Sequence, residues 1–221
     1  MSPIISRERL MRIVGLHPGA VQVILPDWFV PTFQEIVIFL QGMAKASQGI
    51  GMILYNPPHA KKKLLPQEFA QLKQVISELI GLKVCDGDEF WYQQMREHCH
   101  NLSVFIPGHH LATGIKNGAQ GSYSNMACLH PGAAQKWYQQ TQDNIIDALE
   151  LENRIAIFMQ KYITPFLQQG YSNQALDKLL AAIGNWSAVG TQLRWPYKFI
   201  NQDQACHIRQ GAIDIIPEFI V

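Results

Sequence analysis

The sequence predicts an α/β protein in which a parallel sheet is followed by a purely helical region. Short runs of aliphatic and β-branched residues alternate with longer amphipathic segments in the first part of the chain, which is typical of βα units. From Asp143 onward the apolar residues follow a helical period only. We therefore divide the 221 residues into a βα part over residues 1–142 and a C-terminal helical region over residues 143–221.

Five strands are expected from the short apolar runs. They cover residues 21–25, 51–55, 80–85, 102–106 and 119–123. The last is the weakest by propensity, since glycine and polar residues dominate it. Pro57 and Pro58 end the second run, because proline cannot donate a hydrogen bond to a strand partner.

Helices are expected between and after these strands. They cover residues 7–16, 66–79, 89–98, 111–116, 131–140, 143–169, 173–184 and 202–213. A further helix begins at the capping box formed by Thr32 and Glu35, in which the hydroxyl and the carboxylate each accept from a backbone amide of the other residue. Asn173 is the expected N-cap of its helix, and Gly170 and Gly184 mark helix ends.

Five strands leave two architectures open. An open, doubly wound sheet can be built from five strands, whereas a (β/α)₈ barrel needs eight strands and about 250 residues. The periodicity alone slightly favours the open sheet. The residues at the strand ends, described below, favour the barrel.

Composition and charge exclude several classes of protein. The net charge is +1, and the only dense basic run is Lys61–Lys63, so a nucleic-acid partner is not expected. The four cysteines are widely spaced and form no C-x-x-C pair, which argues against a disulfide framework or a zinc knuckle. No signal peptide and no run of about 18 apolar residues occurs. A cytoplasmic protein without a membrane partner is predicted.

Metal binding is not predicted either. His98 with His100, and His109 with His110, are the closest pairs of potential ligands. Adjacent histidines in a strand point to opposite faces, and no acidic partner accompanies either pair at ligand spacing.

Lys83 is unusual because it lies inside an apolar strand. Strand alternation places it on the same face as Gly81 and Cys85. If that face is a barrel interior, partial desolvation lowers the lysine pKa, and the free amine becomes a nucleophile for a ketone. The plain alternative is a lysine that extends to solvent or pairs with Asp86 or Asp88. Lys83 alone favours that alternative.

Lys83 belongs to one of five motifs that follow one another along the chain. They are Leu54-Tyr55-Asn56-Pro57-Pro58, Gly81-Leu82-Lys83 with Gly87-Asp88, Phe105-Ile106-Pro107-Gly108, Gly118-Ala119-Gln120-Gly121 with Ser124-Asn125, and Gly190-Thr191-Gln192-Leu193-Arg194-Trp195-Pro196. In sequence and order, this set resembles the dihydrodipicolinate synthase and N-acetylneuraminate lyase family of Schiff-base aldolases. The match extends over nearly the whole chain.

The resemblance implies an incomplete (β/α)₈ barrel of about five βα units, lacking the first three, with a C-terminal helical extension. It also implies that Lys83 forms an imine with pyruvate or another 2-keto acid and that Tyr55 relays protons. Gly108 and Tyr123 would shape the substrate pocket. No cofactor is implied, because the imine itself is the electron sink. The exposed sheet edges of an incomplete barrel predict a homo-oligomer.

Departures from the family pattern bear on the substrate. The family's glycine-threonine segment, which holds the keto acid carboxylate, does not occur in this chain. Trp28 stands where related enzymes carry a tyrosine of the proton relay, Ala60 where dihydrodipicolinate synthases carry an arginine, and Tyr123 where an aliphatic residue is usual. An aldolase or dehydratase acting on another 2-keto acid is therefore favoured. The alternative is an inactive, shortened family member that retains only assembly or binding surfaces.

Overall fold

The computed structural model describes residues 2–220, which form two compact units. The first unit contains the described residues up to Ile106 together with Asn117–Gly121, and the second contains Pro107–Lys116 and the residues from Ser122 onward. The boundary predicted between residues 142 and 143 is of another kind, because it separates the βα part of the sequence from the C-terminal helical region. It stays a prediction. Within the described chain, no helix is long and apolar enough to cross a membrane.

Five strands form one sheet, in the order β1-β2-β3-β4-β5. The strands are β1 (Ala20–Ile24), β2 (Gly51–Asn56), β3 (Leu79–Val84), β4 (Ser103–Pro107) and β5 (Gly121–Tyr123). The pairs β1–β2, β2–β3 and β3–β4 are parallel. The strands predicted from the apolar runs are confirmed, and the one with the weakest propensity is the shortest.

Helices alternate with the strands of the first unit. They are α1 (Pro3–Ile13), η1 (Val14–Leu16), α2 (Phe33–Ser47), α3 (Pro66–Val75) and α4 (Glu89–His98). The predicted capping box opens α2: the Thr32 amide donates to the Glu35 carboxylate at 2.7 Å, and the Glu35 amide donates to the Thr32 hydroxyl at 3.3 Å. These hydrogen bonds satisfy two amides that have no partner within the helix.

The predicted helix over residues 66–79 is too long. α3 ends at Val75, whose side chain is 51% exposed. Ile76 already has an extended backbone, with φ −129° and ψ 93°. Leu79 fits the helical period, but it is the first residue of β3 and is fully buried. The short connection between helix and strand therefore continues the same apolar spacing, which hides the helix end in the sequence.

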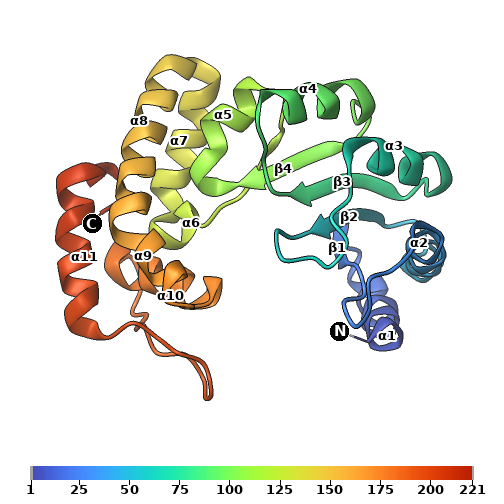
Figure 1. The fold of residues 1–221 in the computed structure, drawn as a ribbon, viewed down its shortest axis with the longest axis horizontal. Helices are drawn as coiled ribbons and strands as arrows, with labels where there is room; N and C mark the ends of the chain where they lie inside the picture. The colour runs from blue at the N-terminus through green and yellow to red at the C-terminus, as the bar shows by residue number, and fades with distance from the viewer. Residues whose placement is uncertain (1, 221) are drawn as a thin grey trace. The chain divides into compact units, whose positions relative to one another are not determined.

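One face of the sheet carries the core of the first unit, and the helices cover it (Figure 1). Buried strand residues on this face include Val21, Val23, Met52, Leu54, Leu82 and Val104, and buried helix residues against them include Ile36, Leu40, Phe69 and Leu72. The alternate strand positions are partly exposed. This difference between the two faces follows from the two-residue period of a strand.

The second unit is helical apart from the ends of β4 and β5. It contains η2 (Gly108–His110), α5 (Leu111–Lys116), α6 (Met126–Leu129), α7 (Pro131–Asp143), α8 (Ile145–Phe158), a π-helical turn η3 (Met159–Ile163), α9 (Thr164–Gln168), α10 (Asn173–Gly184), α11 (Gln202–Ile215) and η4 (Pro217–Phe219). Helices α7 and α8 run side by side (Figure 1). The helical region predicted after Asp143 is thus present.

Two details of this region differ from the prediction. The single helix expected over residues 143–169 begins at Ile145 and is interrupted by the π-helical turn just before Pro165. Proline has no amide hydrogen and cannot continue the regular ladder, so a wider turn precedes it. The N-cap of α10 is Ser172 rather than Asn173, since the Ser172 hydroxyl accepts from the Ala175 amide at 3.3 Å.

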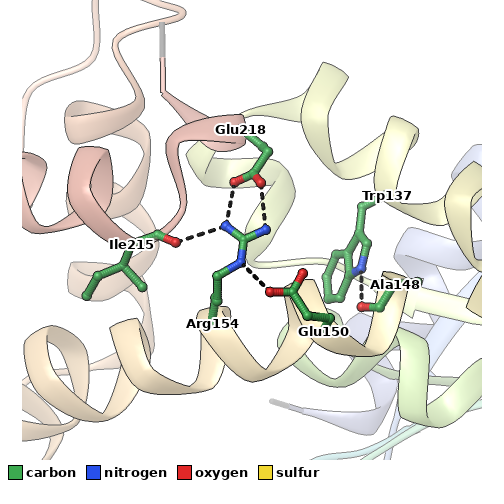
Figure 2. Close-up of polar contacts among 6 residues, drawn as sticks. All are labelled: Trp137, Ala148, Glu150, Arg154, Ile215 and Glu218. Atoms are coloured by element: carbon green, nitrogen blue, oxygen red, sulfur yellow. Dashed lines mark hydrogen bonds and ion pairs between the residues drawn. The ribbon is translucent and has the colours of Figure 1, made fainter. Parts of the chain in front are cut away.

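Arg154 of α8 joins the C-terminal turn to this helix (Figure 2). Its guanidinium donates to both carboxylate oxygens of Glu218, at 3.0 and 2.6 Å, and to the carbonyl of Ile215 at 3.0 Å. These hydrogen bonds raise the pKa of Arg154 and lower the pKa of Glu218. The planar guanidinium offers two parallel N–H groups that match the two oxygens of a carboxylate. The contact therefore fixes the orientation of the Glu218 side chain in addition to pairing two opposite charges.

Glu152 of α8 is a buried carboxylate, 8% exposed, that caps α5. It accepts from the amides of Ala112 at 2.7 Å and Thr113 at 3.1 Å, and from the Thr113 hydroxyl. A buried charge is costly unless donors surround it, and the first amides of a helix supply such donors. Glu152 therefore fixes the segment that follows β4.

Candidate active site

Tyr55 and Lys83 lie side by side on neighbouring strands. Tyr55 of β2 pairs with Lys83 of β3, and each is the next-to-last residue of its strand. The Lys83 ammonium nitrogen lies 4.1 Å from the centre of the Tyr55 ring. A cation at this distance is attracted by the quadrupole of the aromatic face. The structure thus brings together the two residues to which the motifs assign imine chemistry.

The face on which they lie is the one opposite the helix-covered core. The parallel register forms a row across four strands, from Ile24 through Tyr55 and Lys83 to Phe105. All four of these side chains are partly exposed, whereas Leu82, next to Lys83, is fully buried. In a closed barrel of parallel strands this face becomes the interior, and the carboxyl ends of the strands carry the reactive groups.

Gly81 allows the strand of Lys83 to approach its neighbour closely. It lies two residues before Lys83 on the same face and pairs with Ser103 of β4. A Cβ atom at Gly81 would lie 2.9 Å from the Ser103 carbonyl oxygen. That oxygen is backbone and cannot move without shifting β4. The glycine of the Gly-Leu-Lys motif is therefore needed by the packing of the sheet.

We expect Gly81→Ala to lower the free energy of unfolding by about 1–3 kcal/mol, the usual cost of overpacking. Urea unfolding followed by circular dichroism measures it. Gly19→Ala is the control, because a Cβ at Gly19 meets no atom within 4 Å. Equal unfolding midpoints for the two variants would contradict the close approach of β3 and β4.

The loop after β1 reaches the loop after β2 through Lys61. Its ammonium donates to the carbonyl oxygen of Trp28 at 2.9 Å. The Trp28 ring itself is 70% exposed. Trp28, which the resemblance places at the position of a tyrosine, therefore contributes a backbone acceptor here, and its indole lies largely in solvent.

Cys85 lies two residues after Lys83, directly beyond the end of β3, and is half-buried. Burial raises the pKa of its thiol, Asp86 raises the pKa further, and Lys63 acts in the opposite direction. The thiol is therefore protonated at neutral pH, and a protonated thiol is a poor nucleophile. The structure agrees with Cys85 as a small apolar side chain.

Gly108 and Tyr123, the predicted pocket residues, belong to the second unit. Gly108 follows β4 directly, and a Cβ at this position would overlap Ser124, so no larger residue fits. Tyr123 ends β5, and its side chain is 40% exposed. Their contact with a substrate stays a prediction.

The adjacent histidines lie in a 3₁₀ turn and not in a strand as assumed from the sequence. His109 and His110 are part of η2, and their ring centres are 4.2 Å apart. A ring nitrogen of His109 lies 3.2 Å from the Asn125 side-chain amide. Across residues 2–220, no group of three or more His, Cys, Asp and Glu side chains is arranged to hold a metal ion.

Asn56 stands inside the tyrosine motif, but no role was predicted for it. Its side chain is buried, at 6% exposure, and it bonds to the backbone of the loop that follows Tyr55. The only hint in the sequence is a polar residue on the apolar face of the strand.

Comparison with sequence families gives one match that covers most of the chain. The model of the dihydrodipicolinate synthetase family matches residues 10–210. Comparison with curated proteins gives no significant match.

Several solved structures share the fold. N-acetylneuraminate lyase from Fusobacterium nucleatum is 17% identical, with a TM-score of 0.78, and the alignment covers 97% of this chain and 72% of the lyase. A prophage protein of the dihydrodipicolinic acid synthase family from E. coli K12, in complex with pyruvate, is 15% identical, with a TM-score of 0.81 and the same coverage. Dihydrodipicolinate synthase from Bacteroides thetaiotaomicron is 16% identical, with a TM-score of 0.78, covering 96% of this chain and 72% of that enzyme.

At such identities the likeness establishes the fold. These structures are (β/α)₈ barrels, and the chain spans 72% of their length. The predicted architecture, five βα units of such a barrel followed by C-terminal helices, is confirmed. The open doubly wound sheet, which the periodicity alone favoured slightly, is excluded.

Proposed function

Because the chain belongs to the dihydrodipicolinate synthetase family, we propose that it is an aldolase-type lyase whose Lys83 forms a Schiff base with pyruvate or another 2-keto acid. The family consists of Schiff-base aldolases and lyases. The observation that carries the proposal is the 4.1 Å contact between the Lys83 ammonium nitrogen and the Tyr55 ring at the carboxyl ends of β2 and β3. The pyruvate complex of the E. coli K12 protein supports a keto acid as substrate.

The proposed chemistry begins with the neutral amine of Lys83. Its nitrogen attacks the keto carbon, and a carbon–nitrogen bond forms as the carbonyl oxygen takes up a proton. Loss of that oxygen as water gives the imine. The imine nitrogen then accepts the electron pair released when a proton or a carbon fragment leaves the neighbouring carbon. The enamine so formed takes up a proton, or bonds to a second carbonyl compound, at the same carbon and becomes an imine again. Hydrolysis of this imine returns the lysine and the keto acid product.

Tyr55 is the proposed carrier of protons in these steps. A phenol can both donate and accept a hydrogen bond, so the Tyr55 hydroxyl can give a proton to the substrate hydroxyl that leaves as water, and can later take a proton from the water that hydrolyses the imine. The ring of Tyr55 also holds the Lys83 ammonium at a defined place on the sheet. A phenylalanine would keep the second role and lose the first.

Exchange of the methyl protons of pyruvate for deuterium tests the proposed function. An imine of pyruvate loses a methyl proton to form an enamine, and reprotonation in D₂O introduces deuterium. We expect the chain to accelerate the loss of the pyruvate methyl signal in proton NMR above the buffer rate. Longer 2-keto acids, tested in the same way, rank the substrates. Exchange at the buffer rate with every keto acid would favour the inactive family member.

Tyr55→Phe is expected to slow this exchange by about 100-fold, the usual contribution of a general acid–base group. Borohydride should still trap an imine at Lys83 in this variant, because the tyrosine forms no bond to the substrate. A thermal melt close to that of the unaltered chain shows that the fold is kept. Exchange at the unaltered rate would remove Tyr55 from the proton relay.

A further inference from the structure

The side chain of Asn56 points away from Tyr55, into the buried side of β2. Its amide nitrogen donates to the carbonyl of Lys62 at 2.9 Å, and its oxygen accepts from the amide of Leu64 at 2.9 Å. One side chain thus closes the loop that runs from the end of β2 towards α3. The bond from the Leu64 amide is buried, and the bond to the Lys62 carbonyl is partly buried. Buried hydrogen bonds of this kind are costly to lose.

The closed loop carries three consecutive lysines. Lys61 donates to the carbonyl of Trp28, and Lys62 pairs with Glu68 at 2.7 Å. Lys63 lies between the two backbone groups that Asn56 holds, and it is near enough to Cys85 to affect the thiol. Lys61 and Lys62 thus hold the loop to the segment after β1 and to α3, and Asn56 holds it to the end of β2.

Only an amide side chain of this length supplies both bonds. Aspartate can accept from the Leu64 amide but cannot donate to the Lys62 carbonyl, and alanine does neither. Pro57 and Pro58 cannot donate to a sheet partner, and the bond from the Ala60 amide to the Pro57 carbonyl, at 2.9 Å, is a local turn. Asn56 therefore supplies hydrogen bonds between the end of β2 and the loop that these residues do not.

We propose that Asn56 is a positioning residue of the active site: by clamping the loop of residues 57–64, it holds the end of β2 so that Tyr55 stays against Lys83. Asn56 is the last residue of β2 and pairs with Val84, directly beyond the Tyr55–Lys83 pair. The effect of Asn56 on catalysis rests on the proposed function. The two hydrogen bonds by which Asn56 holds the loop do not depend on it. Misplacement of a reacting group by about 1 Å can cost on the order of 100-fold in rate.

Limited trypsin digestion tests the clamp, because Lys61, Lys62 and Lys63 are three adjacent cleavage sites in the loop. We expect Asn56→Ala to be cut there about tenfold faster or more, the effect of losing two hydrogen bonds, with Asn56→Asp in between. Ser47→Ala is the matched control: Ser47 is also buried, and its hydroxyl donates to a backbone carbonyl, that of Ala44, at 2.9 Å. Cleavage at the other lysines and arginines, read in the same digest, separates loop opening from general unfolding.

Deuterium exchange of pyruvate at saturating concentration tests the consequence. Asn56→Ala is expected to slow the exchange about tenfold or more, Asn56→Asp less, and Ser47→Ala not at all. The proposal is overturned if both Asn56 variants are cut in the loop at the rate of Ser47→Ala. It is also overturned if loop cleavage rises and exchange stays at the unaltered rate. If the unaltered chain gives no exchange, the proposed function fails instead, and the digestion alone decides whether Asn56 holds the loop.

Discussion

Replacement of Lys83 by alanine is expected to reduce the deuterium exchange of pyruvate to the rate of buffer alone. The lysine is the covalent partner of the substrate in the proposed reaction, and no other group in the row Ile24–Tyr55–Lys83–Phe105 can form an imine. The fold should persist, because Lys83 is partly exposed and lies outside the helix-covered core, and its cation–π contact with Tyr55 is worth about 0.5–1 kcal/mol.

Lys73→Ala is the control for this variant. Lys73 lies on α3 and donates to the carbonyl of Ser77 at 2.9 Å, away from the sheet face of Lys83. Its removal should leave the exchange rate unchanged. Residual exchange in Lys83→Ala equal to that of Lys73→Ala would assign the exchange to another amine.

Gly184→Ala is expected to give the largest loss of stability in the second unit. Gly184 ends α10 and is buried, and a Cβ there would overlap the backbone carbonyl of Leu129 in α6. The helices would have to separate, at a cost of about 3 kcal/mol, against a gain of about 1 kcal/mol from the better helix propensity of alanine. The net loss of about 2 kcal/mol corresponds to a fall of roughly 4–8 °C in melting temperature.

Differential scanning calorimetry measures this fall, and Gly190→Ala is the matched control. A Cβ at Gly190 meets no atom within 4 Å, so this glycine should accept alanine without a change in melting temperature. Equal melting temperatures for the two variants would mean that α10 and α6 do not approach as closely as the structure shows.

Much of the fold is predictable because its elements have strong local signals. The strands are short apolar runs, and α2 begins at the capping box of Thr32 and Glu35. The errors arise where two structures share one pattern. Ile76 and Leu79 continue a helical spacing although they lie in a connection and a strand, and the helical period around Pro165 gives no sign of the π-helical turn.

The residues of the candidate site that stand in a family motif can be predicted from the sequence. Tyr55 and Lys83 stand 28 residues apart in the sequence, and the parallel pairing of β2 and β3 makes them neighbours. The clamp of Asn56 has no such signal, because its partners are backbone atoms of Lys62 and Leu64, and any residue supplies those. The barrel itself followed from the family motifs, since the strand count alone allowed an open sheet.

Borohydride reduction in the presence of pyruvate tests the imine at Lys83 directly. Reduction converts the imine into a stable secondary amine, so the peptide that carries Lys83 gains the mass of pyruvic acid less one oxygen atom. We expect this adduct on Lys83 in the unaltered chain, its persistence in Tyr55→Phe, and its absence in Lys83→Ala. An unmodified Lys83 peptide after reduction with pyruvate and with several longer 2-keto acids would contradict the Schiff-base assignment.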